Sequence, residues 1–405
     1  MRIVYLHQYF LTPDMAGGTR SYEMARRLVA AGHEVHMVTT DQRATGSGCW
    51  RQSTEAGILV HWAPVLYDNR MTFGRRILAF VRFAWMATRR AVSLRGDVIF
   101  ATSTPLTIAI PALVASAIRR VPFVFEVRDM WPDVPIALGA IRSPASVALA
   151  RWLERLTYRR AAHVVALAPG MRDDIVAKGI PSEKVSVIPN GCDLDVFAGP
   201  TNARAVRDAN AWLGDRPLVL YAGTIGMVNG VHYLVEVARA VKRLDPEIRF
   251  ALFGAGGESN SVRELASRSG VLNDNFFMHE PLPKRQLADW LAAADMLVAL
   301  FTGPRVIWKD AVQNKFFDAL AAGKPIANNF DGWQSRIAAE ADIGLVLDPH
   351  DPVSAAEQLV HALRDTQWLA GVPARTRVLA EGQFNRNLLG ARLADILESV
   401  VKRQC

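Results

Sequence analysis

The chain has 405 residues, of which 50% are apolar and 21% are charged. This composition excludes a disordered, collagen-like or coiled-coil protein, and the length predicts two domains of roughly 150 to 200 residues each. Three scattered cysteines without a C-x-x-C spacing predict neither a disulfide framework nor a cysteine-based zinc site. The longest apolar run, residues 105–118, is too short for a membrane-spanning helix.

Positive charge is concentrated in the first half of the chain. Residues 1–200 contain 24 Lys and Arg against 16 Asp and Glu, whereas residues 201–405 contain 23 of each, so the net charge of +8 belongs to the first half. No acidic residue lies between Asp68 and Asp97, a segment with seven arginines: Arg70, Arg75, Arg76, Arg82, Arg89, Arg90 and Arg95. We therefore expect an anionic partner for this half.

The first half alternates short apolar runs with longer amphipathic segments. The pattern predicts buried strands at residues 3–6, 35–39, 98–101, 123–127 and 164–166, and a helix at 19–31 that ends at Gly32. A doubly wound parallel sheet follows from this order.

The same alternation restarts after a polar linker that runs from Pro189 to about Arg216. It predicts strands at 218–222, 249–253, 296–300 and 325–327, and a helix at 231–244. We expect an α/β protein with two Rossmann-like doubly wound domains, at 1–198 and 199–385. A C-terminal helix at 386–405 could serve either half, packing back on the first domain.

Two glycine-rich turns follow predicted strands. Gly17-Gly18 precedes a helix, and Gly254-Ala-Gly256-Gly257 follows the strand at 249–253. Such turns bring backbone N–H groups to a phosphate, but glycine in a tight turn is at least as often structural. The second turn lacks the full G-x-G-x-x-G spacing and the downstream acidic residue of a dinucleotide site, which argues against NAD.

The segment from Asp310 to Pro325 is the most informative. Asp310 and Asp318 are eight residues apart, which on a helix places them two turns apart on nearly one face, and Lys315 lies on the same side. A sugar-nucleotide site needs such carboxylates for hydroxyl groups and a cation for the diphosphate. An amphipathic helix with a solvated polar face would show the same spacing. Spacing alone favours this solvated face, but the setting supports a site, because this small-residue helix ends directly before a buried strand.

Six ordered motifs resemble one enzyme family. They are Gly17-Gly18, the run from Glu126 to Asp133, the run from Ile188 to Asp193 with Phe197, the turn from Gly223 to Gly226, Phe253 to Gly256, and Asn314 to Pro325. Together they resemble the family 4 retaining glycosyltransferases with the GT-B fold, in which the two domains face across a cleft. The chain is most similar to the WbuB-like branch, which adds N-acetylated deoxyamino sugars in O-antigen or capsule assembly.

The resemblance implies a UDP-sugar donor, a polyprenyl-diphosphate-linked glycan acceptor, retention at the anomeric carbon and no metal or other cofactor. In the family, two glutamates spaced E-x7-E contact the donor sugar and the ribose; here these positions are Asp310 and Asp318. The expected nucleotide-sugar-binding set is Gly17, Gly18, Gly223, Thr224, Asn229, Gly254, Gly256, Leu282, Asp310, Asn314, Lys315 and Asp318.

The family's usual diphosphate Arg and Lys are replaced by Thr224 and Asn229. We therefore expect Lys315, the N–H groups of the glycine turns and Arg128 to contact the diphosphate. Arg128 and Asp129 stand where many relatives have a His-Asp pair. Because arginine stays protonated, Arg128 cannot act as a base, so this pair is expected to orient substrate groups. A structural turn before Pro132 is the alternative. Arg128, Asp129 and Lys315 form the expected catalytic set.

The pair Asp193 and Asp195 is not interpreted as a metal site, because the resemblance places it at the domain junction. Loops at 308–313 and 328–333 are expected to select the sugar.

The arginine-rich segment predicts a helix on an anionic membrane. Arg75, Arg82 and Arg89 are seven residues apart, Arg76 and Arg90 lie beside them, and apolar residues fill the other faces. An ordinary domain helix with one basic face is the alternative, and nucleic acid is disfavoured because no aromatic platform is interleaved. We expect a cytoplasmic protein, peripheral on the inner face of the cytoplasmic membrane.

Two other functions remain open at this point. A UDP-sugar epimerase with the GT-B fold would share the nucleotide site but needs acids and bases around the sugar and no membrane surface. A non-catalytic sugar-nucleotide-binding scaffold would explain the unusual residues Thr224, Asn229, Asp310 and Asp318.

Overall fold

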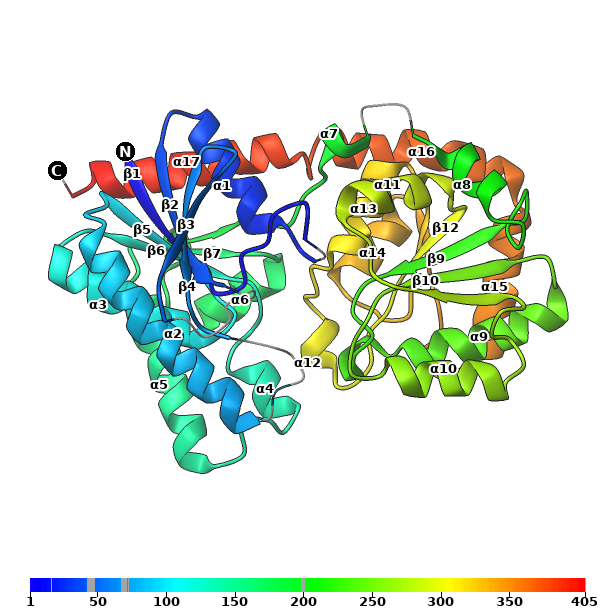
Figure 1. Cartoon of the computed structure of the whole chain (residues 1–405), viewed down its shortest axis with the longest axis horizontal. Helices are drawn as coiled ribbons and strands as arrows, with labels where there is room; N and C mark the ends of the chain where they lie inside the picture. Colours follow the sequence, from blue (N-terminus) through cyan, green and yellow to red (C-terminus); the bar gives the residue numbers. More distant parts are fainter. Residues whose placement is uncertain (16, 42–47, 67–70, 72, 198–200, 405) are drawn as a thin grey trace. The chain divides into compact units, whose positions relative to one another are not determined.

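The computed structural model describes residues 1–404 except 16, 42–47, 67–70, 72 and 198–200. The chain forms two compact units (Figure 1). Unit 1 comprises Met1–Thr12, Thr19–Pro189 and Asn387–Cys405, and unit 2 comprises Pro13–Gly18 and Asn190–Arg386. The units divide after Pro189, whereas the boundary expected at 198/199 lies at residues outside the described part.

The sheet of unit 1 has eight strands among the described residues, in the order β3-β4-β2-β1-β5-β6-β7-β8. All neighbouring strands are parallel except the pair β3 and β4, which is antiparallel. The strands are β1 (Arg2–Leu6), β2 (Glu34–Thr40), β3 (Arg51–Glu55), β4 (Ile58–Ala63), β5 (Val98–Thr102), β6 (Phe123–Val127), β7 (His163–Ala166) and β8 (Val185–Val187). The five strands expected in this half are confirmed.

The expectation of a purely parallel sheet is wrong at one edge. β3 reads Arg-Gln-Ser-Thr-Glu and is largely exposed, so it lacks the apolar run that indicates a buried strand. It pairs as a hairpin with β4, which is mostly buried. An edge strand of this polarity is held by its partner and has no apolar signal of its own.

Helices cover both faces of this sheet. They are α1 (Arg20–Ala30), α2 (Phe73–Ser93), α3 (Ala109–Arg119), α4 (Asp133–Ala137), α5 (Pro144–Arg160), α6 (Pro169–Ala177) and α17 (Arg386–Lys402). α17, red in Figure 1, returns from the end of the chain, and its residues from Asn387 onward belong to unit 1. Its Leu389, Leu393 and Leu397 are fully buried. The four-residue spacing of these leucines places them on one helix face, which anchors the helix.

Unit 2 contains a parallel sheet of six strands among its described residues, in the order β11-β10-β9-β12-β13-β14. The strands are β9 (Leu218–Ala222), β10 (Arg249–Phe253), β11 (Phe276–His279), β12 (Met296–Ala299), β13 (Ile326–Asn328) and β14 (Gly344–Val346). The helices are α7 (Leu194–Phe197), α8 (Ala203–Ala209), α9 (Val231–Leu244), α10 (Ser259–Arg268), α11 (Lys284–Ala293), α12 (Arg305–Trp308), α13 (Asn314–Ala322), α14 (Trp333–Glu340), α15 (Pro352–Arg364) and α16 (Thr366–Glu381).

Two apolar cores flank the second sheet. One joins α9, α10 and α15 to one face, and the other joins α11, α13 and α14 to the opposite face. The repeating pattern of Val231, Leu234, Val235, Ala238 and Val241 explains the burial of α9, because residues three and four apart share one helix face. The helix predicted at 231–244 and the four strands predicted at 218–222, 249–253, 296–300 and 325–327 are present to within one or two residues.

The candidate residues follow the carboxyl ends of strands, and the described strands of each sheet have one point at which their order reverses. In unit 1 the order reverses direction between β1 and β5, and in unit 2 between β9 and β12. In open α/β sheets, ligands bind outside the carboxyl ends of the strands at such switch points. No helix among the described residues is long and apolar enough to cross a bilayer.

Candidate functional site

The turn after β9 leaves room only for glycine at its first position. A Cβ atom on Gly223 would lie 2.6 Å from the Cε of Lys315, and the backbone there has a φ of +157°. The N–H of Gly223 donates to the carbonyl of Phe253 at 2.9 Å, which ties the turn to β10. Gly223 therefore lets the side chain of Lys315 lie against the backbone at the carboxyl end of β9.

Lys315 is half-buried, and no carboxylate among the described residues forms an ion pair with its ammonium group. Its Nζ lies 4.7 Å from the centre of the Tyr221 ring and 3.5 Å from Oε1 of Gln313. Burial lowers the pKa of Lys315 to about 8, and the charge of Asp318 only partly opposes this. Burial disfavours the protonated form of the amine, and a nearby negative charge favours it. A desolvated ammonium group therefore binds an anion readily.

Gly254 and Gly256 pack against the same turn. A Cβ atom on Gly254 would overlap the carbonyl oxygen of Gly223, and one on Gly256 would overlap that of Ile225. The N–H of Ile225 donates to the carbonyl of Ala255 at 3.1 Å. The structure therefore gives these two glycines a packing role in shaping the turn, and their expected contact with a nucleotide stays a prediction.

Asp310 does not share a helix with Asp318, contrary to the expectation from their spacing. α13 begins at Asn314, and Asp310 lies four residues earlier, where it pairs with Lys309 at 3.4 Å. Gln313 is extended because Gln334 bonds both its N–H and its carbonyl, each at 3.0 Å. These bonds satisfy the backbone outside a helix, so only Lys315 and Asp318 keep the predicted helical relation. α13 ends at Gly323, as expected.

Asp318 belongs to a network that the sequence did not predict. Lys284, at the start of α11, lies 3.2 Å from Oδ1 of Asp318 and forms a short contact with Oδ2 of Asp193. Asp193 is 1% exposed and also pairs with Arg386 at 3.1 Å. The two carboxylates raise the pKa of Lys284 against the opposing effect of burial. The contact with Lys284 thus holds the Asp318 side chain in position.

The remaining donor candidates lie around this turn and network. Gly18 lies beside Asn314, since a Cβ on Gly18 would lie 2.9 Å from Nδ2 of Asn314, and Gly17 precedes it with a φ of +135°. The carbonyl of Thr224 accepts from the hydroxyl of Tyr221 at 2.7 Å. Asn229 ends a short 3-10 helix in the turn, and Leu282 packs against the core beside Lys284.

Arg128 and Asp129 belong to unit 1 and follow strand β6. An N–H of the Arg128 guanidinium donates to Nε2 of His7 at 3.1 Å, and its backbone N–H donates to the hydroxyl of Ser103 at 2.9 Å. Burial, together with the Arg128 charge, lowers the pKa of His7 well below its usual value, so His7 accepts this bond as a neutral ring. Asp129 is exposed and accepts from the hydroxyl of Thr104 at 2.8 Å. Arg128 is therefore oriented at the carboxyl ends of β1, β5 and β6.

A buried ion pair supports this edge of unit 1. Arg20 and Glu126 have fully buried side chains and lie 2.7 Å apart. Arg20 also donates to the carbonyls of Ile188 and Pro189, and the hydroxyl of Thr102 donates to Glu126 at 2.6 Å. Burial alone would raise the pKa of Glu126, but the Arg20 charge outweighs it and lowers the pKa. Glu126 lies in one of the sequence motifs, but no local pattern links it to Arg20, which is 106 residues away.

The arginine-rich segment forms α2, as expected, but its arginines differ in exposure. Arg75, Arg82 and Arg89 are exposed, whereas Arg76 and Arg90 are half-buried. The Arg90 guanidinium stacks over Trp50 at 4.5 Å. Only the first three therefore form an exposed basic row; Arg70 lies outside the described residues.

Comparison with known proteins identifies the family. Residues 16–191 match the family described as Glycosyl transferase 4-like domain, and residues 216–365 match the family described as Glycosyl transferases group 1. The first match lies mainly in unit 1 and the second lies in unit 2. The chain belongs to the GT-B glycosyltransferases of the family 4 type.

This glycosyltransferase is 30% identical over 240 residues to D-inositol 3-phosphate glycosyltransferase of Xylanimonas cellulosilytica. That match covers 56% of this chain and 54% of the relative, so it spans about half of the relative's length. The chain is 25% identical over 285 residues to the putative colanic acid biosynthesis glycosyl transferase WcaI of Escherichia coli K12, covering 66% of this chain and 69% of WcaI.

The fold of the glycosyltransferase also matches a solved structure, that of Anabaena Alr3699/HepE in complex with UDP. The TM-score is 0.71 at 18% identity, over 98% of this chain and 100% of that chain. At this identity the likeness shows the fold alone.

Proposed function

We propose that this glycosyltransferase moves a sugar from a UDP-sugar to a polyprenyl-diphosphate-linked glycan in cell-surface polysaccharide synthesis. The donor sugar that we propose is an N-acetylated deoxyamino sugar, following the resemblance to the WbuB-like branch. The similarity to WcaI supports a role in polysaccharide synthesis, and the fold shared with a UDP complex supports the donor.

The observation that carries the donor proposal is Lys315. Its ammonium group is buried against Gly223 with no carboxylate partner among the described residues, at the carboxyl end of β9. A nucleoside diphosphate would bring the missing negative charge. This placement offsets the loss of the family's usual Arg and Lys, whose positions hold Thr224 and Asn229.

The proposed transfer retains the configuration at the anomeric carbon. The bond from that carbon to the diphosphate oxygen breaks, and the electron pair leaves with UDP, where Lys315 stabilises the charge that develops. An acceptor hydroxyl attacks from the same face, and its proton passes to the departing diphosphate oxygen. In this proposal Arg128 and Asp129 orient substrate groups, and Asp318 accepts hydrogen bonds from the ribose hydroxyls. Metal independence remains part of the proposal, following the family resemblance.

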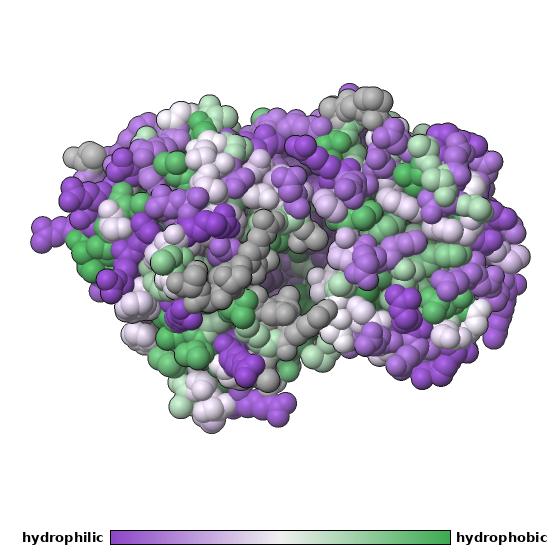
Figure 2. All heavy atoms as spheres, in the orientation of Figure 1, coloured by the Kyte–Doolittle hydropathy of each residue, from purple (hydrophilic) through white to green (hydrophobic). Residues whose placement is uncertain are grey.

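The acceptor proposal draws on the exposed surface of α2, α3 and α5, which are neighbouring helices in unit 1 (Figure 1). Exposed apolar side chains here include Leu78, Trp85, Ile118, Leu149 and Trp152. The one acidic residue in the three helices, Glu154, is buried. Figure 2 shows apolar patches beside polar ones over this part of the molecule. Apolar side chains bordered by arginines suit an anionic bilayer, the site of a lipid-linked acceptor.

Replacing Asp318 with asparagine should weaken UDP binding. The change keeps the side chain's size but removes the charge that holds Lys284 and accepts ribose hydroxyls. A ligand at about 100 times its dissociation constant stabilises the native state by about 2.7 kcal/mol, so a thermal-shift panel of UDP, GDP, ADP and NAD reports binding directly. We expect UDP alone to raise the melting temperature of the wild type, and the shift to fall strongly in Asp318→Asn.

The control for this experiment is Asp215→Asn, which removes a carboxylate that is 83% exposed in the same unit. An equal UDP shift in Asp318→Asn and wild type would reject the ribose assignment. A shift with NAD instead of UDP would reject the donor class. UDP binding without sugar transfer to lipid-linked glycan would favour a non-catalytic scaffold, and interconversion of UDP-sugars would favour an epimerase.

Replacing Arg75, Arg82 and Arg89 with glutamine should release the protein from anionic vesicles. Each basic residue near such a surface contributes about 1 kcal/mol, so losing three should weaken binding by about a hundredfold. Cosedimentation with phosphatidylglycerol-containing vesicles measures this. Arg243, Arg263 and Arg268 are exposed in unit 2, and their replacement by glutamine removes the same net charge as a control. Equal vesicle binding by both triple variants would contradict the role of α2.

A further inference from the structure

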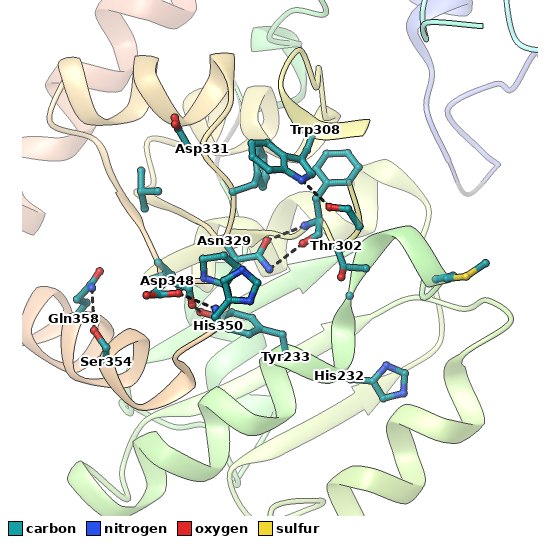
Figure 3. Close-up of a pocket in the computed structure, with 18 of the residues that line it drawn as sticks. His232, Tyr233, Thr302, Trp308, Asn329, Asp331, Asp348, His350, Ser354 and Gln358 are labelled. Atoms are coloured by element: carbon teal, nitrogen blue, oxygen red, sulfur yellow. Dashed lines mark hydrogen bonds between the residues drawn. The ribbon is translucent and has the colours of Figure 1, made fainter. Parts of the chain in front are cut away.

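A cavity of about 810 Å³ opens in unit 2 beyond the carboxyl ends of β12, β13 and β14 (Figure 3). Its walls come from the turn after β9, from α9 and α15, and from the loops that follow the three strands. Among the described residues, its wall includes Trp308, Asn329, Phe330 and Asp331 from the two loops expected to select the sugar, but none of the residues in the expected nucleotide-sugar-binding set. α9 and α15 pack on one face of the sheet, whereas α13, which carries Lys315 and Asp318, packs on the opposite face.

Aromatic side chains form part of the cavity wall. Phe301 and Phe330 meet edge to face at 5.1 Å, and the Trp308 ring lies 6.5 Å from that of Phe330. Nε1 of Trp308 donates to the carbonyl of Gly303 at 3.1 Å, which holds the indole in place. In Figure 3, Trp308 and Thr302 lie on one side of Asn329, and Asp348, His350 and Tyr233 lie on the other.

The polar groups of the cavity are fixed by the protein itself. Asn329 is 3% exposed, and its amide both accepts from the N–H of Phe301 at 2.8 Å and donates to the carbonyl of that residue at 3.0 Å. The Tyr233 hydroxyl donates to the carbonyl of Asp348 at 2.7 Å. The cavity is therefore preformed, with aromatic faces beside positioned oxygen atoms.

The negative charge of the lining disfavours the diphosphate group of a UDP-sugar in this cavity. Three carboxylates, those of Glu258, Asp331 and Asp348, line the cavity, and its described lining contains two histidines but no lysine or arginine. A phosphate or diphosphate would meet repulsion and find no cation. Carboxylate oxygens accept hydrogen bonds from hydroxyl groups, and aromatic rings pack against C–H faces.

We propose that this cavity binds an uncharged saccharide, as part of a glycan, at a site separate from that of the UDP-sugar. A pyranose ring has an apolar C–H face for Trp308 and a rim of hydroxyl groups for Asp348 and Glu258. The volume lies within the range of small-molecule sites and accommodates more than one ring. The identity of this glycan as acceptor or product rests on the proposed function, but its binding is measured without turnover.

The test uses saturation-transfer difference NMR on the full chain with methyl glycosides of glucose, galactose, mannose, N-acetylglucosamine and N-acetylgalactosamine. We expect saturation transfer to at least one glycoside in wild type and in Trp308→Phe, which keeps an aromatic face, and at least a tenfold loss of affinity in Trp308→Ala. The signal should persist when UDP saturates the donor site. The 6-phosphate of the glycoside that binds should give no signal.

Three outcomes would overturn the inference: no saturation transfer to any of the five glycosides, equal binding by wild type and Trp308→Ala, or displacement of the glycoside by UDP. UDP affinity is measured on the same samples by thermal shift. If the wild type does not bind UDP, the proposed donor is rejected, but the proposal that the cavity binds a saccharide is not affected. Val378→Ala, which removes an exposed apolar side chain of α16 in the same unit, serves as the control for general effects of the substitution.

Discussion

The Lys315→Met variant should be more stable than the wild type and nearly inactive. The pKa of Lys315 in the folded protein is about 8, whereas its ordinary value is 10.5. A lowered folded-state pKa means that the unfolded chain binds the proton more tightly. The free energy of unfolding therefore rises as pH increases from about 8 to about 10.5, and at pH 7 the buried charge destabilises the fold. Methionine removes that charge and should stabilise the protein by on the order of 3 kcal/mol.

Activity should change in the opposite direction. Removing one preorganised group that stabilises developing charge lowers rates by roughly a hundredfold to a thousandfold. We therefore expect kcat/KM for sugar transfer to fall by at least about a hundredfold in Lys315→Met. In the wild type, UDP affinity should decline as pH rises through 8, because the ammonium group loses its proton, and this decline should be absent from the variant.

Urea unfolding, transfer kinetics and calorimetric titration with UDP provide the three measurements. Lys324→Met is the matched control, since burial also lowers the pKa of Lys324 and no substrate role is proposed for it. That variant should keep its activity. A Lys315→Met protein that is less stable than the wild type, or that transfers sugar at the wild-type rate, would contradict the proposed role.

Replacing Glu126 with glutamine should destabilise unit 1 by about 3 to 5 kcal/mol. Both side chains of the Arg20–Glu126 pair are fully buried, so the variant leaves a guanidinium in the interior without its counterion. The pKa of Glu126 is lowered in the folded state, so its ionised form contributes stability above the unfolded-state pKa. That contribution is lost as pH falls through the folded-state value. The difference between wild type and variant should therefore shrink in acid.

Chemical denaturation followed at several pH values measures this difference, with hydrogen exchange assigning the loss to unit 1. Glu247→Gln is the control, because the pair Arg216 and Glu247 is exposed and should contribute at most about 1 kcal/mol. The double variant Arg20→Met, Glu126→Leu should recover much of the lost stability, since apolar groups can replace a buried ion pair. A loss below 1 kcal/mol in Glu126→Gln would show that Arg20 is stabilised without Glu126.

Continuous apolar runs explain which strands the sequence predicts. β6 and β9 match their predicted bounds because every position in them is apolar or buried. Five described strands were not predicted: β3, β4, β8, β11 and β14. β4 and β11 are apolar runs that were left uninterpreted, whereas β3 and β14 have no such run. β3 is polar and β14 has three residues, so neither carries a periodic signal, and each forms through pairing with a neighbour. The extended backbone at Gln313, held by Gln334, likewise has no local signal.

The candidate site was predicted where residues lie close together in sequence and missed where they come together through the fold. Lys315 and Asp318 are one helical turn apart, so spacing was sufficient. Asp318 pairs with Lys284, and Asp193 pairs with Arg386. These partners lie far apart in the sequence, so no local pattern links them. For Gly254 and Gly256, spacing alone could not separate a phosphate turn from the tight packing that the structure shows.

Because α17 belongs mainly to unit 1, the two units can finish folding in a different order from the one in which they are translated. The ribosome completes all of unit 2 before residues 387–405, which unit 1 requires, have been made. Until then, the surface that receives Leu389, Leu393 and Leu397 stays uncovered. Unit 2, which is nearly continuous from Asn190 to Arg386, can therefore finish folding first, although its sequence is translated second. A separately expressed unit 1 would need residues 387–405 joined to its other segments.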